Sequence, residues 1–139
     1  IITKMGVEFL PEKEISNIYT HSGLQLNNFE HYEFTPSKPI DVDGVKIYLS
    51  FLPGMQIDLS EISVVKSKLT ETIPISNISA TSESAYITND KNEYLSFLIL
   101  NEENEILKIK FKDKISLVNK IILKIKISKL DLANNSLCK

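Results

Sequence analysis

The stretch that decides the fold is Gly44–Val65, which reads GVKIYLSFLPGMQIDLSEISVV. From position 45 to 51, apolar residues alternate with lysine, tyrosine and serine. A period of two places alternate side chains on opposite faces of a β-strand. Pro53-Gly54 then has turn chemistry, because proline fixes a negative φ and glycine accepts a positive one. We therefore expect two strands joined by a tight turn, a hairpin at the centre of the fold.

The second arm of this stretch changes phase once. The apolar face runs through Ile57 to Leu59 and resumes at Ile62, so the alternation slips by one residue. A β-bulge sets two residues of one strand against one residue of its partner, which absorbs such a slip. The sequence therefore predicts a bulge at Ser60-Glu61.

Alternation recurs along the rest of the chain, most clearly at 29–34, 94–100, 106–111 and 121–127. About eight strands with turn signals between them, and no sustained helical stripe, are typical of a sandwich or barrel. The sequence predicts an all-β fold, an antiparallel two-sheet β-sandwich that is jelly-roll-like, in a single domain over residues 1–139. Residues 1–28 give little strand signal, and 131–139 are expected to form a frayed tail.

The composition limits the classes of partner. The net charge is −2, and all sixteen basic residues are lysine. Bidentate recognition of phosphate and guanine uses the planar fork of arginine, so we expect no nucleic-acid partner. The apolar windows are far shorter than the about 18 residues of a membrane helix, so we expect no transmembrane segment. Cys138 is the single cysteine, which excludes an intramolecular disulfide within this sequence.

The sequence Asp41-Val42-Asp43-Gly44 invites a metal-binding interpretation. As an EF-hand loop it fails, because the twelfth position from Asp41 is Leu52, where a bidentate glutamate is needed. As a DxD motif of a nucleotide-sugar transferase it lacks the surrounding α/β domain. We interpret the motif as a polar turn before a strand and predict no metal or cofactor, with a calcium site as the alternative.

No motif for catalysis is found in the sequence. His21 and His31 are ten residues apart, and there is no G-x-S-x-G nucleophile motif. We therefore predict that the protein is not an enzyme.

Lysines concentrate on the last two long predicted strands: Lys108, Lys110, Lys112, Lys114, Lys120, Lys124, Lys126 and Lys129. If these two strands pair, several ammonium groups share one face, which would suit a polyanion. The alternative, which we favour, is that the lysines keep strand faces solvated and protect sheet edges from aggregation.

Aromatic residues offer the best candidates for a ligand site. Four tyrosines are expected to be partly exposed: Tyr32, Tyr48, Tyr86 and Tyr94. Flat rings stack on the apolar faces of sugars, and nearby carboxylates bond sugar hydroxyls. We predict a site made of Tyr48, Asp41, Asp43 and Tyr32, with Tyr48 as the first candidate because it lies opposite the apolar set of its strand. The alternative is cross-strand packing that only stabilises the sheet.

The order of the central motifs supports a resemblance. An aromatic-x-F-x-P phrase at Tyr32–Pro36 is followed by V-x-I-x-L at Val45–Leu49, the Pro53-Gly54 turn and I-x-L-x-x-I-x-V at Ile57–Val64. This pattern, over roughly residues 29–128, resembles the jelly-roll, carbohydrate-binding-like (galactose-binding-like) accessory domains of bacterial cell-surface glycosyltransferases. The resemblance implies a non-catalytic module that contacts a glycan or braces a catalytic domain.

Two functions are therefore predicted. The first is a non-catalytic carbohydrate-binding or accessory module of a larger bacterial envelope-polysaccharide protein, with a glycan or a neighbouring domain of the parent polypeptide as partner. The second is a protein-interaction or structural β-sandwich without a glycan ligand. The chain begins with isoleucine, so we expect it to be a piece of a longer protein. The sequence does not decide between a cytoplasmic and a cell-envelope-associated location in a bacterium.

Overall fold

The structure, a computed structural model, describes residues 4–11, 18–22, 26–50, 54–82, 85–90, 93–100 and 104–129. Almost all of this chain is β-strand, with one short 3-10 helix, η1 (Ile75–Asn77). No helix in these ranges is long and apolar enough to cross a membrane. The predicted tail at 131–139, with Cys138, lies outside the described residues, as do parts of the segment 1–28.

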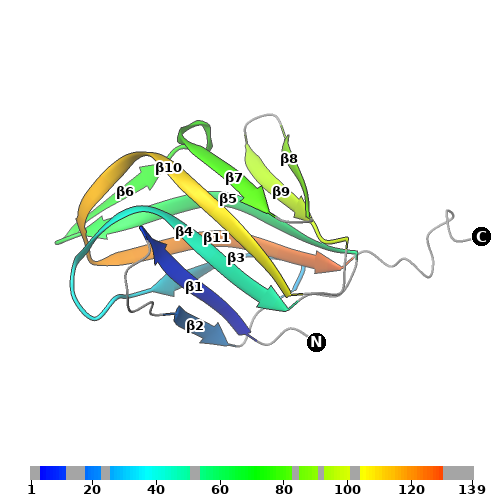
Figure 1. The fold of residues 1–139 in the computed structure, drawn as a ribbon, viewed down its shortest axis with the longest axis horizontal. Helices are drawn as coiled ribbons and strands as arrows, with labels where there is room; N and C mark the ends of the chain where they lie inside the picture. The colour runs from blue at the N-terminus through cyan, green and yellow to red at the C-terminus, as the bar shows by residue number, and fades with distance from the viewer. Residues whose placement is uncertain are drawn as a thin grey trace, which may run out of the picture.

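The strands form two sheets that face each other (Figure 1). Sheet A has the order β2 (Ile18–Ser22), β1 (Lys4–Leu10), β4 (Ile40–Ser50), β10 (Asn104–Val118) and β7 (Ile78–Ser82). Sheet B has the order β3 (Phe29–Phe34), β11 (Lys120–Lys129), β5 (Met55–Lys66), β9 (Tyr94–Leu98) and β8 (Tyr86–Asp90), and β6 (Leu69–Ile73) also pairs with β5. The pairs between these strands are antiparallel, which confirms the two-sheet β-sandwich.

The two arms of the central stretch lie in different sheets. β4 pairs with β1 and β10 in sheet A, whereas β5 pairs with β11, β9 and β6 in sheet B. The predicted hairpin is therefore wrong, although Gly54 has the positive φ, 87°, that the turn chemistry predicted. Among the described strands, the chain changes sheet at most connections, in the jelly-roll manner, and the consecutive strands that pair are β1–β2, β5–β6 and β8–β9.

The predicted bulge in β5 is confirmed by the register of its pairing with β11. Glu61 is opposite Lys124, and Leu59 is opposite Ile125, so that Ser60 is the extra residue. Leu59 and Ile62 are consequently both buried on the inner face. The slip in the apolar pattern was the signal of this backbone irregularity.

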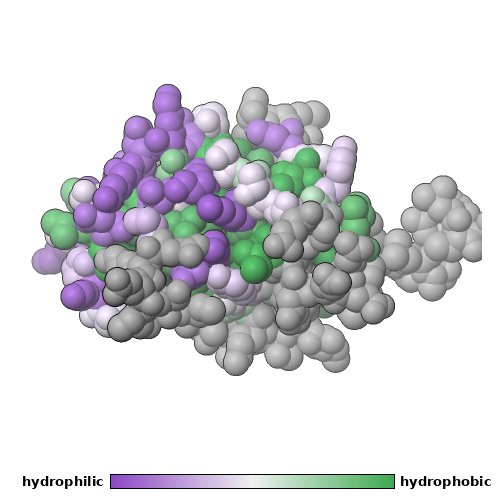
Figure 2. Space-filling model, viewed as in Figure 1, coloured by the Kyte–Doolittle hydropathy of each residue, from purple (hydrophilic) through white to green (hydrophobic). Residues whose placement is uncertain are grey.

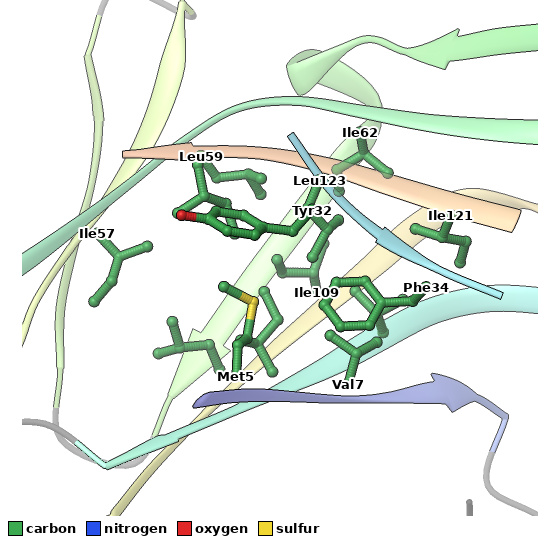
Figure 3. Packing of buried hydrophobic residues seen from close by; sticks show 14 of the residues in the cluster. Met5, Val7, Tyr32, Phe34, Ile57, Leu59, Ile62, Ile109, Ile121 and Leu123 are labelled. Atoms are coloured by element: carbon green, nitrogen blue, oxygen red, sulfur yellow. The ribbon is translucent and has the colours of Figure 1, made fainter. Parts of the chain in front are cut away.

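The apolar core fills the space between the sheets, and both sheets contribute to it (Figure 3). Its largest fully buried side chains include Phe34, Phe97, Met5, Ile47, Ile57, Leu59, Ile62, Leu107, Ile109, Ile121 and Leu123. At one place the two central strands of sheet A approach very closely, because a Cβ on Gly44 would lie against the carbonyl oxygen of Ile109. Only glycine fits at this position of β4 without moving β10.

Candidate functional site

Tyr48, the first predicted site residue, is half-buried on the outer face of sheet A. Its neighbour in sequence, Ile47, points into the core, so the alternation sends the tyrosine outward. The Tyr48 hydroxyl donates a hydrogen bond to Glu8 Oε1 on the adjacent β1, with an oxygen–oxygen distance of 2.8 Å. Glu8 itself is only 5% exposed. The tyrosine therefore uses its polar end to hold two strands together.

The two predicted aspartates bind β10 to β4. Asp41 Oδ1 accepts a hydrogen bond from the backbone N–H of Leu117 at 3.0 Å. Asp43 Oδ1 lies 3.1 Å from Lys110 Nζ, which is an ion pair between β4 and β10. Along β4, Asp43 is five residues from Tyr48, which is about 17 Å in a strand. The structure therefore does not gather these residues into one pocket.

Tyr32, the fourth predicted site residue, is in the core. It is only 2% exposed and, in Figure 3, its ring lies among Leu59, Leu123 and Met5. The expectation of an exposed tyrosine is wrong here, because β3 turns Tyr32 and Phe34 inward and leaves its other side chains outside. A sugar ring cannot stack on a face that is already packed.

The lysine-rich strands do not share a face. β10 is in sheet A and β11 is in sheet B, so the condition for a shared lysine face, pairing of these two strands, is not met. Figure 2 looks onto the side of sheet A and shows hydrophilic residues gathered over β10 and its bend. Within the described ranges, no group of three or more acidic, histidine or cysteine side chains could hold a metal ion.

The outer face of sheet B carries a different arrangement, centred on Asp58 of β5. Its neighbours Ile57 and Leu59 are fully buried in the core, so Asp58 points to the other side of the sheet. In the register of the sheet, Asp58 is opposite Lys126 on β11 and opposite Ser96 on β9. The carboxylate is nevertheless only 2% exposed.

Three side chains satisfy this buried carboxylate. Ser96 Oγ donates a hydrogen bond to Asp58 Oδ1 at 2.6 Å, and Gln56 Nε2 donates to the same oxygen at 2.9 Å. Lys126 Nζ lies 3.6 Å from the other oxygen, Oδ2. A buried charge is tolerated when it is paired and hydrogen-bonded in this way.

Aromatic rings meet above the same strands. Phe29 of β3 and Tyr94 of β9 make an edge-to-face contact with ring centroids 6.3 Å apart. The two strands between them in the sheet order are β11 and β5, which carry Lys126 and Asp58. Lys126 Nζ also lies 5.1 Å from the centroid of the Phe29 ring, a cation–π distance. The rings and the ion pair therefore form one layer on the outer face of sheet B.

A shallow, open groove of about 430 Å³ adjoins this layer over β5, β9 and β8. Its lining is Gln56, Tyr86, Thr88, Asn89, Tyr94, Ser96 and Leu98, all uncharged. Tyr86 is 61% exposed and is opposite Leu98, four residues along β9 from Tyr94. Since four residues of a strand span about 14 Å, the two tyrosines stand at the two ends of the groove.

Sequence reasoning named two of these groove residues and missed the others. Tyr86 and Tyr94 were among the tyrosines expected to be exposed, but Gln56, Ser96 and Asn89 gave no signal. The outward direction of Asp58 was predictable from the sequence, because an aspartate between two apolar residues of an alternating strand must face outward.

A second described cavity, beside β6, holds only about 100 Å³, room for a few water molecules.

Comparison with protein-family models, with curated proteins and with solved structures found no match for this chain. The resemblance to accessory domains of glycosyltransferases therefore stays a prediction.

Proposed function

We propose that the protein is a non-catalytic carbohydrate-binding module and that the groove on the outer face of sheet B takes an oligosaccharide. The observation that carries the proposal is that two tyrosines, Tyr86 and Tyr94, line the same open, uncharged groove near its two ends. Tyrosine rings offer flat apolar faces for sugar rings at little conformational cost. Between the tyrosines, amide and hydroxyl groups supply the hydrogen bonds that fix a ligand's orientation.

The shape of the groove supports a chain-like ligand. It is open to solvent, so a long ligand can lie on it without threading through the protein. The wider context, an accessory part of a larger bacterial envelope-polysaccharide protein, rests on the sequence resemblance alone. In that context the groove would hold a glycan near a catalytic domain.

The second predicted function, a protein-docking sandwich, is not favoured by the exposed apolar residues. Within the described ranges, the large exposed aliphatic side chains are Leu26, Leu69, Leu100 and Leu117. The contacts of these residues or of their neighbours in sequence place Leu26 beside β11, Leu100 near the start of β5, and Leu69 and Leu117 near the end of β5. They make no broad apolar sheet face of the size that marks a docking surface.

Calorimetric titration with a panel of oligosaccharides tests the proposal. We expect at least one to bind with a Kd between roughly 1 μM and 1 mM, which is about −8 to −4 kcal/mol. The double variant Tyr86→Ala/Tyr94→Ala should lose this binding while keeping its circular dichroism spectrum, and Tyr48→Ala on the other sheet should retain it. Binding that persists in the double variant, or a panel without any binder, would overturn the proposal.

A further inference from the structure

We infer that the groove selects uncharged, hydroxyl-rich oligosaccharides and rejects acidic ones, and that Asp58 sets this preference. The inference rests on the proposed function and adds the class of glycan. The floor of the groove is formed by Gln56 and Ser96, and each has a hydrogen atom already engaged. The single hydroxyl hydrogen of Ser96 is donated to Asp58 at 2.6 Å, and one amide hydrogen of Gln56 is donated to the same oxygen at 2.9 Å.

These bonds fix what the floor can offer to a ligand. Once its hydrogen is used, the Ser96 oxygen presents only lone pairs to the groove. Gln56 keeps its acceptor oxygen and has one donor fewer. A sugar hydroxyl can donate to these acceptors, whereas a carboxylate or phosphate group has no hydrogen to give. The floor therefore suits ligands that bring their own donors.

The charges beneath the groove act in the same direction. The groove lining is uncharged, and the nearest described ion pair is Asp58 with Lys126, 3.6 Å apart. The carboxylate is 2% exposed, but the lysine side chain is 34% exposed and better screened by water. The less screened member of the pair is negative, so an anion on the floor would be repelled.

The length of the groove adds a size requirement. Tyr86 and Tyr94 are about 14 Å apart along the strands, which is more than one sugar ring can span. Both tyrosines are engaged only by a ligand of several sugar units. The structure thus points to a neutral oligosaccharide, in preference to a monosaccharide or to a uronic-acid polymer.

The test compares neutral hexamers of glucose, mannose, xylose and N-acetylglucosamine with hexamers of galacturonic and mannuronic acid at low salt. We expect at least one neutral hexamer to bind the protein and the acidic hexamers to bind at least tenfold more weakly. Acidic hexamers that bind as well as neutral ones would overturn the inference and leave the proposed function standing. If no hexamer binds, the proposed function fails, and the inference fails with it.

Two variants test the role of charge. Asp58→Asn leaves Lys126 without its partner, so affinity for the acidic hexamers should rise roughly tenfold. Because that change is buried, Thr88→Lys serves as a second variant that places a cation on the exposed edge strand without touching the core. Because Thr88 lines the groove, this lysine meets a bound ligand directly and should likewise raise the affinity for the acidic hexamers. If both folded variants still exclude acidic hexamers, charge is not the discriminating feature and the inference is wrong.

Discussion

The two outer faces of this sandwich use carboxylates differently. On sheet A, Asp43 pairs with Lys110, and both side chains are partly exposed although the Asp43 Oδ1 atom is itself buried. On the same sheet, the buried Glu8 accepts a hydrogen bond from Tyr48. On sheet B, Asp58 is buried beside Ser96 and Lys126 and is held by three polar partners. The carboxylates of sheet A tie neighbouring strands together. The Asp58 carboxylate fixes the hydrogen bonds of a groove floor.

The difference teaches where a binding function can reside in a fold with two similar layers. On sheet A, the described carboxylate contacts join one strand to the next: Asp43 to Lys110, and the buried Glu8 to Tyr48. Where folding already fixes the side chains of a face, a ligand does not have to supply the free energy of ordering them when it binds. Sheet B has such a face, and the following variants break or sharpen the contrast.

The largest effect is expected on sheet A, from the close approach of β4 to β10. Gly44→Ala places a methyl group against the Ile109 carbonyl oxygen, and the strands must separate to admit it. We expect a loss of about 3 kcal/mol in the free energy of unfolding, measured by urea denaturation. Lys46→Ala, on the same strand, is the control and should cost far less. Equal stability of Gly44→Ala and the parent protein would contradict the packing described for sheet A.

A smaller loss is expected from Asp58→Ala on sheet B. The change leaves the hydrogen-bond donors of Ser96 and Gln56 without their acceptor, in a place that water scarcely reaches. Denaturation should show a loss of about 2 kcal/mol. The matched variant Asp43→Ala removes a carboxylate from a pair whose side chains are both partly exposed and should cost less than about 1 kcal/mol. Equal losses for the two variants would remove the contrast between the faces.

The third effect concerns binding and not stability. Tyr86→Ala removes an exposed ring, so folding is unaffected, but a neutral oligosaccharide should bind about tenfold more weakly, a loss of about 1.4 kcal/mol. Calorimetry with Tyr48→Ala in parallel supplies the comparison, since that tyrosine serves sheet A through Glu8. A loss of affinity in Tyr48→Ala of the same size would place the ligand on the wrong sheet.

The smallest effect is expected from Lys126→Ala. This lysine stacks on Phe29 and neutralises Asp58, but its side chain is partly in water. Surface cation–π and ion-pair contacts of this kind contribute about 0.5–1 kcal/mol, and thermal unfolding should reveal a loss of that order. A loss beyond that of Asp58→Ala would mean that the lysine, and not the hydrogen bonds, holds the buried carboxylate in place.

The sequence was sufficient for the strands and insufficient for their partners. Alternation in Met55–Lys66 predicted both the strand and its bulge, because side-chain direction is a local property of the backbone. It could not show that β4 and β5 lie in different sheets, since the same alternation fits any partner strand. Tyr32 was misplaced for a related reason. Phe29–Phe34 carries aromatic residues on both faces, and only packing decides which set is inside.

The partial exposure of some tyrosines was predictable, but a ligand site was not. Tyr48 and Tyr94 are partly exposed and Tyr86 is exposed, whereas the ligand site predicted around Tyr48 stays a prediction. The members of the groove come from β5, β8 and β9, and Gln56 meets Ser96 at Asp58 only through the register of those strands. No spacing within the sequence encodes that register.

The most direct test of the account is NMR mapping of backbone amide shifts during titration with the neutral hexamer that binds best. The account predicts shifts that cluster at Gln56, Tyr86, Tyr94 and Ser96 on sheet B, with the amides of Tyr48 and Asp43 unmoved. Shifts concentrated at Tyr48 and Asp43 on sheet A would contradict it.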